Sequence, residues 1–233
     1  MTLALMTLNG EPVQLTPEGG LFLPACRTLV TADLHFEKGS AMAARGRRLA
    51  PPYDTTVTLD RLQRLVRRMQ PKRVVALGDS FHDDAGPLRL GEGDARRIQA
   101  LTKAVEWVWV AGNHDPDPPA MLGGTAASEL LVGSLLLRHE PRSGPRPGEV
   151  AGHLHPKAAV ATSARRVSSF CFVTDGQRMI LPAFGAYTGG LDVHTPVIRD
   201  LFKQGLKVFL LGQERLYQFP ISKLSKPRRA SSL

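Results

Sequence analysis

Short apolar runs alternate with longer amphipathic stretches through the first half of the chain. A short run bounded by turn residues is typical of a buried strand, whereas apolar residues spaced three and four apart are typical of a helix that covers a sheet. Leu59, Leu62, Val66 and Met69 show this helical spacing most clearly. Strands are therefore predicted at 28–32, 73–77, 107–111, 134–138 and 149–152, and helices at 37–45, 54–69 and 92–103.

Hairpin signals occur near both ends of the chain. Asn9-Gly10 separates two apolar runs, Asp175-Gly176 predicts a two-residue type I′ turn, and 207–211 with 215–219 predicts a further hairpin. Strands that first alternate with helices and then follow one another predict an α/β fold, in which two sheets pack face to face with helices outside. We expect one domain over residues 1–221, followed by a basic, mobile tail over residues 222–233.

Composition and charge narrow the class of protein. The 233 residues are 42% hydrophobic and 22% charged, which is typical of globular chains and excludes a disordered one. Two cysteines outside any zinc-type pair, no leader-like amino terminus and no long apolar run predict a cytoplasmic protein without a membrane partner. The net charge of +9 favours a polyanion such as nucleic acid, although an arginine-rich composition can produce the same value without one.

Six of the seven histidines lie at or just after predicted strand ends, where the active sites of α/β folds are built. Their segments are Asp33-Leu34-His35, Gly78-Asp79-Ser80-Phe81-His82-Asp83, Gly112-Asn113-His114-Asp115, Arg138-His139-Glu140 and Gly152-His153-Leu154-His155. Residues two apart at a strand end point the same way, so Asp33 and His35 are expected to face one ion. Imidazole, carboxylate and carboxamide groups without thiolate suit Mn²⁺, Fe²⁺ or Zn²⁺. The set is too large for one ion, and two ions about 3.5–4 Å apart with a bridging carboxylate would use it.

The order D-x-H, GD, GNH[DE], H and GH-x-H resembles the motif series of the calcineurin-like metallophosphoesterase superfamily. This resemblance implies a two-sheet sandwich flanked by helices. The segments DLHFEKG, AARGRRLAPPYDT, LGDSFHD and PAFGAYTGGL further resemble the ligase-associated DNA damage response endonuclease family. That narrower resemblance implies an endonuclease of DNA repair that associates functionally with a DNA ligase and a helicase. His82 stands where the general superfamily pattern has aspartate, and GD-x-F-H instead resembles the nuclease branch.

Carried over residue by residue, the resemblance implies a ligand set for each of two divalent ions. One ion would be held by Asp33, His35, Asp79 and His155, and the other by Asp79, Asn113, His139 and His153, with Asp79 as the bridge. Two such cations lower the pKa of a bridging water, so that hydroxide is available to attack phosphorus near neutral pH. His114 would donate a proton to the leaving oxygen, and Asp115 would orient His114. Mn²⁺ is our first expectation for the metal, with Fe²⁺ and Zn²⁺ as the alternatives.

Five further residues are candidates for substrate contact, each with a plainer alternative. They are His82, Arg45, Arg47, Arg48 and His194. His82 would touch a substrate phosphate or support the metal ligands. The three arginines would bind phosphate oxygens or lie in a solvated loop. His194 follows FGAYTGG, a glycine-rich segment that would form a loop beside the metals or an ordinary turn.

The favoured hypothesis is a dinuclear-metal phosphodiesterase that hydrolyses nucleic-acid phosphodiester bonds, an endonuclease in DNA repair. A phosphodiesterase or phosphatase for a small nucleotide or phosphorylated metabolite is the first alternative. A cationic rim around the site would favour nucleic acid, and a narrow, capped pocket would favour a metabolite. A non-catalytic interaction protein is the second alternative, because the superfamily includes such members. The complete ligand series and the presence of His114 argue against it.

Overall fold

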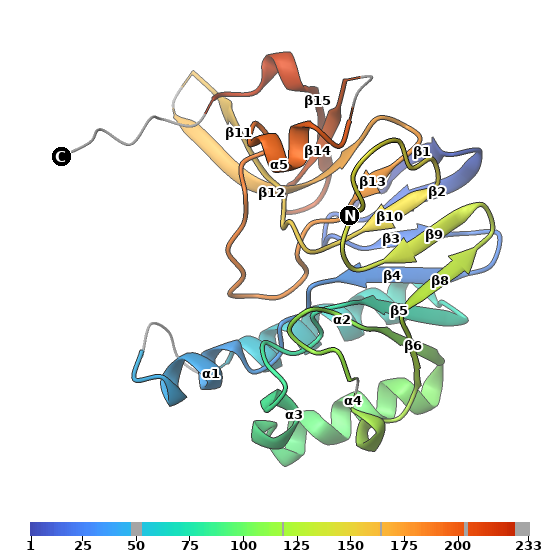
Figure 1. The fold of residues 1–233 in the computed structure, drawn as a ribbon, viewed down its shortest axis with the longest axis vertical. Coiled ribbons are helices and arrows are strands. Elements are labelled where there is room, and N and C mark those ends of the chain that lie inside the picture. Colours follow the sequence, from blue (N-terminus) through green and yellow to red (C-terminus); the bar gives the residue numbers. More distant parts are fainter. Residues whose placement is uncertain (48–52, 118, 164, 203–204, 227–233) are drawn as a thin grey trace.

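Two β-sheets pack face to face at the centre of the molecule, and helices cover the outer face of one of them (Figure 1). The computed structural model describes residues 1–233 except 48–52, 118, 164, 203–204 and 227–233. The predicted α/β class, a two-sheet sandwich flanked by helices, is confirmed.

The first sheet carries most of the candidate ligand segments at one edge. Its order is β1 (Ala4–Leu8), β2 (Glu11–Leu15), β3 (Leu21–Leu23), β4 (Thr28–Ala32), β5 (Arg73–Leu77), β6 (Glu106–Val110) and β7 (Thr125–Ala127). Strands β1 to β4 are antiparallel neighbours, and β4 to β7 are parallel. Parallel pairing brings the carboxyl ends of β4, β5 and β6 together, so the segments that begin with Asp33, Gly78 and Gly112 follow at a common edge.

The second sheet is mixed. Its order is β15 (Leu216–Pro220), β14 (Lys207–Leu211), β12 (Arg166–Thr174), β13 (Met179–Ile180), β10 (Glu149–Ala151), β9 (Leu135–Arg138) and β8 (Glu129–Val132), and β11 (Lys157–Ala161) pairs with β12. The predicted hairpin between β12 and β13 forms, but its two-residue turn is wrong. Thr174 pairs with Met179, so four residues connect the strands. The Asp175 carboxylate accepts the backbone N–H groups of Gln177 and Arg178, which favours this wider turn.

The protein has five helices within its described residues, and the longer ones cover the first sheet. The helices are α1 (Lys38–Ala44), α2 (Asp54–Met69), α3 (Gly86–Arg89), α4 (Glu92–Ala104) and α5 (Pro196–Arg199), with short 3₁₀ turns at Ala120–Leu122 and Ile221–Lys223. Helix α2 has the predicted bounds, and its buried Leu59, Leu62 and Leu65 pack against the sheet because they lie three apart on one face. Helix α1 projects from the body beside the ligand-bearing edge (Figure 1).

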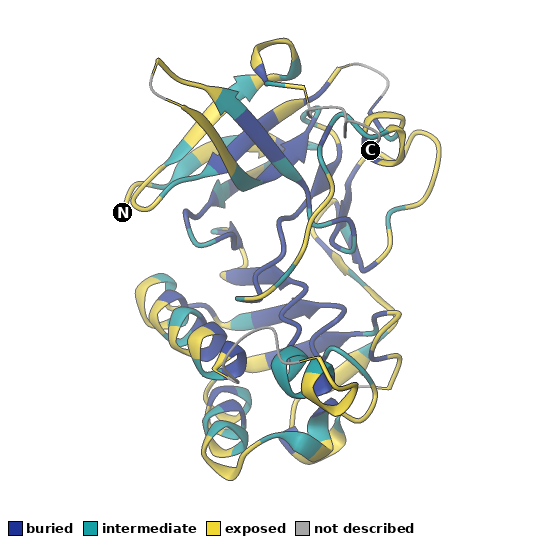
Figure 2. Ribbon diagram, turned by 90° about the vertical axis from the view of Figure 1, so that its left-hand side faces the viewer, coloured by how far each residue is buried: buried dark blue, intermediate teal, exposed yellow. Residues whose placement is uncertain are grey.

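Strand β5 explains why the central strands are continuous apolar runs. Val75 and Leu77 point into the core between the two sheets, whereas Val74 and Ala76 point toward the helices. A strand covered on both faces needs apolar residues at every position rather than at alternate ones. The buried strands form the interior of the molecule (Figure 2). Side chains from α5 and its surroundings cover the other face of the second sheet.

The chain beyond residue 221 packs on the body for longer than expected. Leu224 is buried, and the backbone N–H of Ser225 donates to the carbonyl oxygen of Ala159 on β11. The first residues of the predicted tail therefore pack against β11 in the structure, and its remaining part, 227–233, lies outside the described residues. No helix in the described part of the chain is long and apolar enough to cross a membrane.

Candidate metal centre

Left-handed backbone turns aim the candidate ligands. Positive φ angles occur at Asp33 (55°), His35 (43°), Asp79 (45°), His153 (66°) and His155 (44°). Residues other than glycine seldom adopt this conformation, and those that do are concentrated at functional sites. Asp33 and His35 point toward the same site, as expected for residues two apart. The cause is different from the one used for the prediction, because neither residue lies in an extended strand. Strand β4 ends at Ala32, and its two ligand candidates follow in turns.

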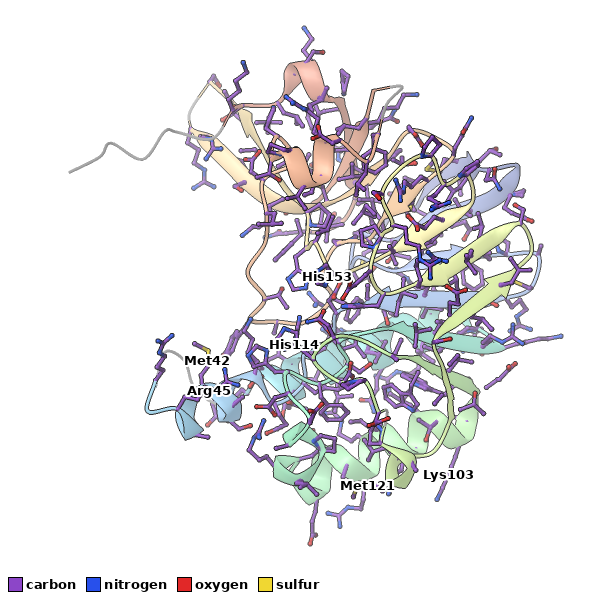
Figure 3. All side chains as sticks on the ribbon, viewed as in Figure 1. Met42, Arg45, Lys103, His114, Met121 and His153 are labelled. Carbon is purple, nitrogen blue, oxygen red and sulfur yellow. The ribbon has the colours of Figure 1, made fainter. Side chains whose placement is uncertain are left out.

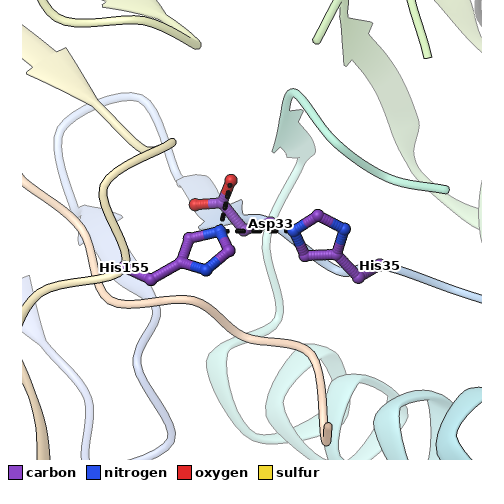
Figure 4. Close-up of side chains that lie close together, drawn as sticks. All are labelled: Asp33, His35 and His155. Carbon is purple, nitrogen blue, oxygen red and sulfur yellow. Dashed lines mark hydrogen bonds and ion pairs between the residues drawn. The ribbon is translucent and has the colours of Figure 1, made fainter. Parts of the chain in front are cut away.

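The first group of ligand atoms comes from opposite sheets. Asp33 and His35 follow β4, and His155 follows β10 (Figure 4). The Nε2 atoms of His35 and His155 lie 3.2 Å apart, and His155 Nε2 lies 3.3 Å from Asp33 Oδ1. Asp33 and His35 are buried, and His155 is partly exposed. This arrangement leaves the group open to solvent on one side.

The second group lies beside the first. His139 Nε2 lies 3.3 Å from Asp79 Oδ1 and 3.2 Å from His153 Nδ1. The carboxamide oxygen of Asn113 lies 3.0 Å from the same His139 nitrogen. The structure therefore brings together all four residues that were expected around the second ion.

The carboxylate of Asp79 faces both groups. Its Oδ1 is directed at His139, and its Oδ2 lies 3.8 Å from His35 Nε2. Ligand atoms on a common ion, with bonds of about 2.0–2.2 Å, lie about 3 Å apart, and the imidazole pairs match this spacing. The donor atoms are nitrogen and oxygen, which suit divalent transition metals. The two groups therefore fit a dinuclear metal centre, with Asp79 placed to bridge it.

Backbone carbonyl groups orient two of the imidazole rings. His139 Nδ1 lies 3.3 Å from the carbonyl oxygen of Leu77, and His155 Nδ1 lies 3.2 Å from that of Gly189. A carbonyl oxygen can only accept, so each Nδ1 carries a proton. The Nε2 atom of each ring is thereby directed at the carboxylates, and it can bind an ion once the ring is neutral. Such outer contacts hold metal-binding histidines in the correct tautomer and orientation.

Burial and close contacts shift the pKa values of these groups. Burial, together with the nearby His155, lowers the pKa of His35 to about 2. For Asp79, burial raises the pKa, but the hydrogen bond and charge of His139 outweigh it and lower the value to about 2. For His139, burial lowers the pKa, but Asp79 and Asp33 outweigh it and raise the value to about 9. His35 is therefore neutral and ready to bind a metal, whereas His139 carries a proton near neutral pH.

Metal binding is expected to release the proton of His139. Only the neutral ring offers Nε2 to an ion, so affinity should rise about tenfold for each pH unit and level off near pH 9, the pKa of His139. Titration calorimetry with Mn²⁺ near neutral pH, in two buffers of different ionisation enthalpy, measures the release. His139→Asn is the matched control, because asparagine has no proton to lose. Equal binding heats in both buffers for the unaltered protein would contradict the prediction.

Two histidines outside the ligand groups stack beside the centre. The rings of His82 and His114 lie nearly parallel, with centroids 5.2 Å apart, and both lie within 5.5 Å of the His35 ring. His114 is exposed, and its backbone N–H donates to Asp79 Oδ1. Burial and then the charge of Lys38 lower the pKa of His82 to about 4. The structure thus places the expected proton donor and His82 together.

Asp115 does not have the expected partner. Its carboxylate accepts the backbone N–H groups of Ser80 and Phe81, at 2.7 and 3.0 Å, and no hydrogen bond joins it to His114 among the described residues. Asp115 therefore supports the loop that carries Asp79 instead of orienting His114. Burial raises its pKa to about 7. The sequence pattern could not show this, because a carboxylate next to a histidine in the chain can also turn inward.

The other candidate substrate-binding residues differ in how close they lie to the candidate metal centre. Arg45 is exposed, with its guanidinium 3.9 Å from Asp83, the residue after His82. Arg47 is exposed, and Arg48 lies outside the described residues. His194 Nδ1 lies 2.8 Å from Asp192 in a turn before α5, and its ring contacts none of the ligand candidates in the part of the chain that the structure describes.

Sequence reasoning missed Lys38. It is the first residue of α1, three residues after His35, and its charge lowers the pKa values of both His35 and His82. A lysine directly after a ligand segment was the available signal. Of the two alternatives for the glycine-rich segment, the structure has the loop beside the centre, because Gly185 donates its N–H to the carbonyl oxygen of Asp33.

Comparisons with known proteins agree with this site. Residues 26–174 match the family model of the calcineurin-like phosphoesterases. The nuclease MPE of Pseudomonas putida has a similar structure, with a TM-score of 0.72 and 28% identity over 93% of this chain and 100% of that one. The phosphoesterase Yfce of E. coli has a TM-score of 0.42 and 17% identity over 83% of this chain and 98% of that one. A comparison with curated proteins finds no match.

The family model spans most of the first sheet and both ligand groups, from before Asp33 to beyond His155. The match therefore covers both candidate ligand groups and not only the surrounding scaffold. The chain belongs to the calcineurin-like phosphoesterase family and is a metal-dependent phosphoester hydrolase.

Proposed function

We propose that this protein is a nuclease, a phosphodiesterase that cleaves DNA internally. The observation that carries the proposal is the pair of cations beside the centre: the half-buried Lys38 and the exposed Arg45 both lie near His82, whose ring stacks on that of His114. A strand of nucleic acid offers several phosphates to such a surface, whereas a small metabolite offers one or two. The similarity to a nuclease over nearly the whole chain supports the same choice. The narrower sequence resemblance supports a role in DNA repair alongside a DNA ligase and a helicase, and the two unpaired cysteines are consistent with a cytoplasmic location.

We further propose Mn²⁺ as the resident metal, with Fe²⁺ and Zn²⁺ suited to the same donor types. Asp33, His35, Asp79 and His155 would hold one ion, and Asp79, Asn113, His139 and His153 the other. When bound, the ions supply Lewis acidity at the phosphoryl oxygens and a hydroxide nucleophile near neutral pH.

The chain's own residues supply the remaining chemistry. His114 is free of both ligand groups and exposed, so its imidazole can donate a proton to the oxygen that leaves phosphorus. Its backbone N–H is held by Asp79, which keeps this donor at a constant place relative to the centre. His82 lies nearly parallel to the His114 ring, and one of its ring N–H groups can itself donate to a phosphate oxygen.

The cationic residues near His82 are expected to act on substrate binding rather than on chemistry. Lys38→Ala and Arg45→Ala should each raise KM for an oligonucleotide about threefold to tenfold and leave kcat nearly unchanged. The dependence of KM on salt concentration should fall by the amount that corresponds to about one phosphate contact. Steady-state kinetics at several salt concentrations measures this effect. Arg96→Ala is the control, because Arg96 is an exposed arginine on the outer helix α4. Losses no larger than those of the control would contradict the assignment.

Cleavage of a circular single-stranded DNA in Mn²⁺ tests the proposed function directly. A closed circle has no ends, so only an endonuclease can open it. We expect the unaltered protein to open the circle and His114→Ala to leave it closed. If the circle survives while a small phosphodiester is hydrolysed, the metal centre is supported and the proposal of an endonuclease is wrong.

A further inference from the structure

The loop over residues 184–191, which we call the rim loop, is fastened to the metal centre on both sides of Tyr187. Before it, Gly185 donates to the carbonyl oxygen of Asp33 at 2.9 Å, and Ala186 donates to the hydroxyl of Thr58 on α2 at 3.0 Å. After it, Gly189 accepts from His155 Nδ1 at 3.2 Å, and Leu191 donates to the carbonyl oxygen of His155 at 3.2 Å. Tyr187 is therefore held close to two candidate ligands by backbone that has little freedom to move.

The Tyr187 side chain makes no polar or aromatic contact that accounts for its position. The residue is 37% exposed, and among the described residues its hydroxyl makes no hydrogen bond and its ring stacks on no other aromatic ring. The rim loop lies on the side of the molecule where His114 and His153 are found (Figure 3). An exposed aromatic ring on a well-fastened loop beside a reaction centre is available to a ligand.

Open space on the rim loop at Gly189, two residues after Tyr187, supports this interpretation. A Cβ atom built on Gly189 would meet no described atom within 4 Å, and Gly189 has no left-handed φ angle. Folding therefore does not require glycine at this position. The missing side chain leaves the rim loop open at Gly189, whose carbonyl oxygen contacts His155, so that a flat group can approach the loop closely there.

We propose that Tyr187 stacks on a nucleobase next to the scissile phosphate. This inference rests on the proposed nuclease function and specifies its substrate as a strand with an unpaired base at that position. An uncharged phenol has little electrostatic attraction to a phosphate, whereas its aromatic face can stack on the flat face of any base. One such stacking contact changes binding affinity about 5- to 150-fold. In this proposal Lys38 and Arg45 bind the phosphates of the nucleic-acid backbone, and Tyr187 makes tight binding depend on a base at that position.

The test compares two substrates of equal length in Mn²⁺: an oligothymidylate, and a strand built wholly from tetrahydrofuran abasic residues. We expect Tyr187→Ala to lower kcat/KM about tenfold on oligothymidylate, through KM, and to leave cleavage of the abasic strand unchanged. Tyr187→Phe keeps the ring and should behave as the unaltered protein. Tyr217→Ala is the matched control, because Tyr217 is an exposed tyrosine on β15, the last strand of the second sheet.

Several outcomes would overturn the proposal. One is equal activity of Tyr187→Ala and the unaltered protein on oligothymidylate. Another is an equal loss on both strands together with lost Mn²⁺, because that result would show that Tyr187 only supports the fold. A loss in Tyr187→Phe as large as in Tyr187→Ala would assign the effect to the hydroxyl. If the unaltered protein cleaves neither strand yet hydrolyses a small phosphodiester, the nuclease function fails as well.

Discussion

Asp79→Ala is expected to strip both metal ions from the protein and to lower phosphodiester hydrolysis by more than about 100-fold. Removing a residue that only supports a metal ligand already lowers metal affinity about 10- to 100-fold, and Asp79 is assigned as a ligand itself. The reason lies in the two oxygens of this carboxylate. One faces His139 at 3.3 Å and the other faces His35 at 3.8 Å, so each ligand group loses an oxygen. The substitution also leaves the backbone N–H of His114 without its acceptor.

Metal content after dialysis, measured by elemental analysis, checks this prediction. Asp192→Ala is the matched control, since Asp192 is a carboxylate that also contacts a histidine, His194, but outside both ligand groups. The control should retain two ions. Normal binding of two ions by Asp79→Ala would disprove the bridge.

His114→Ala is expected to retain both ions and to lose hydrolysis of DNA by about 10²- to 10⁴-fold, the range for removing a general acid. Its imidazole belongs to neither ligand group, and it is exposed where a substrate can approach. Proton donation matters most when the departing oxygen is a poor leaving group. The loss should therefore be large for DNA, whose leaving group is an alkoxide, and much smaller for an ester whose leaving group is p-nitrophenolate.

The measurement is the ratio of the two rates in His114→Ala and in the unaltered protein, together with the metal content of both. His194→Ala serves as the control, because it removes a histidine that contacts Asp192 instead of the centre. If His114→Ala loses half of its metal, or loses the same factor on both substrates, His114 is not the proton donor.

Local patterns predicted most of the scaffold because the signals that specify it are local. The strands over 28–32 and 73–77 and the helix over 54–69 have the predicted bounds. The spacing of apolar residues within an element shows which of its faces are buried, so it can be read from the residues of that element alone. The same holds for the candidate ligands, which follow strand ends in short, recognisable segments. Their individual roles remain predictions, whereas their convergence is a feature of the structure.

The sequence by itself determined the fold class, the chemistry of the donor atoms and their order along the chain. The tertiary structure decided how the donors meet: His35 and His155 are 120 residues apart, yet their nitrogens lie 3.2 Å apart. It also turned Asp115 toward Ser80 and Phe81, and placed the rim loop, through Gly189, beside His155. These outcomes depend on left-handed turns and on hydrogen bonds between distant segments. Such features form only once the two sheets have packed, and no local propensity encodes them.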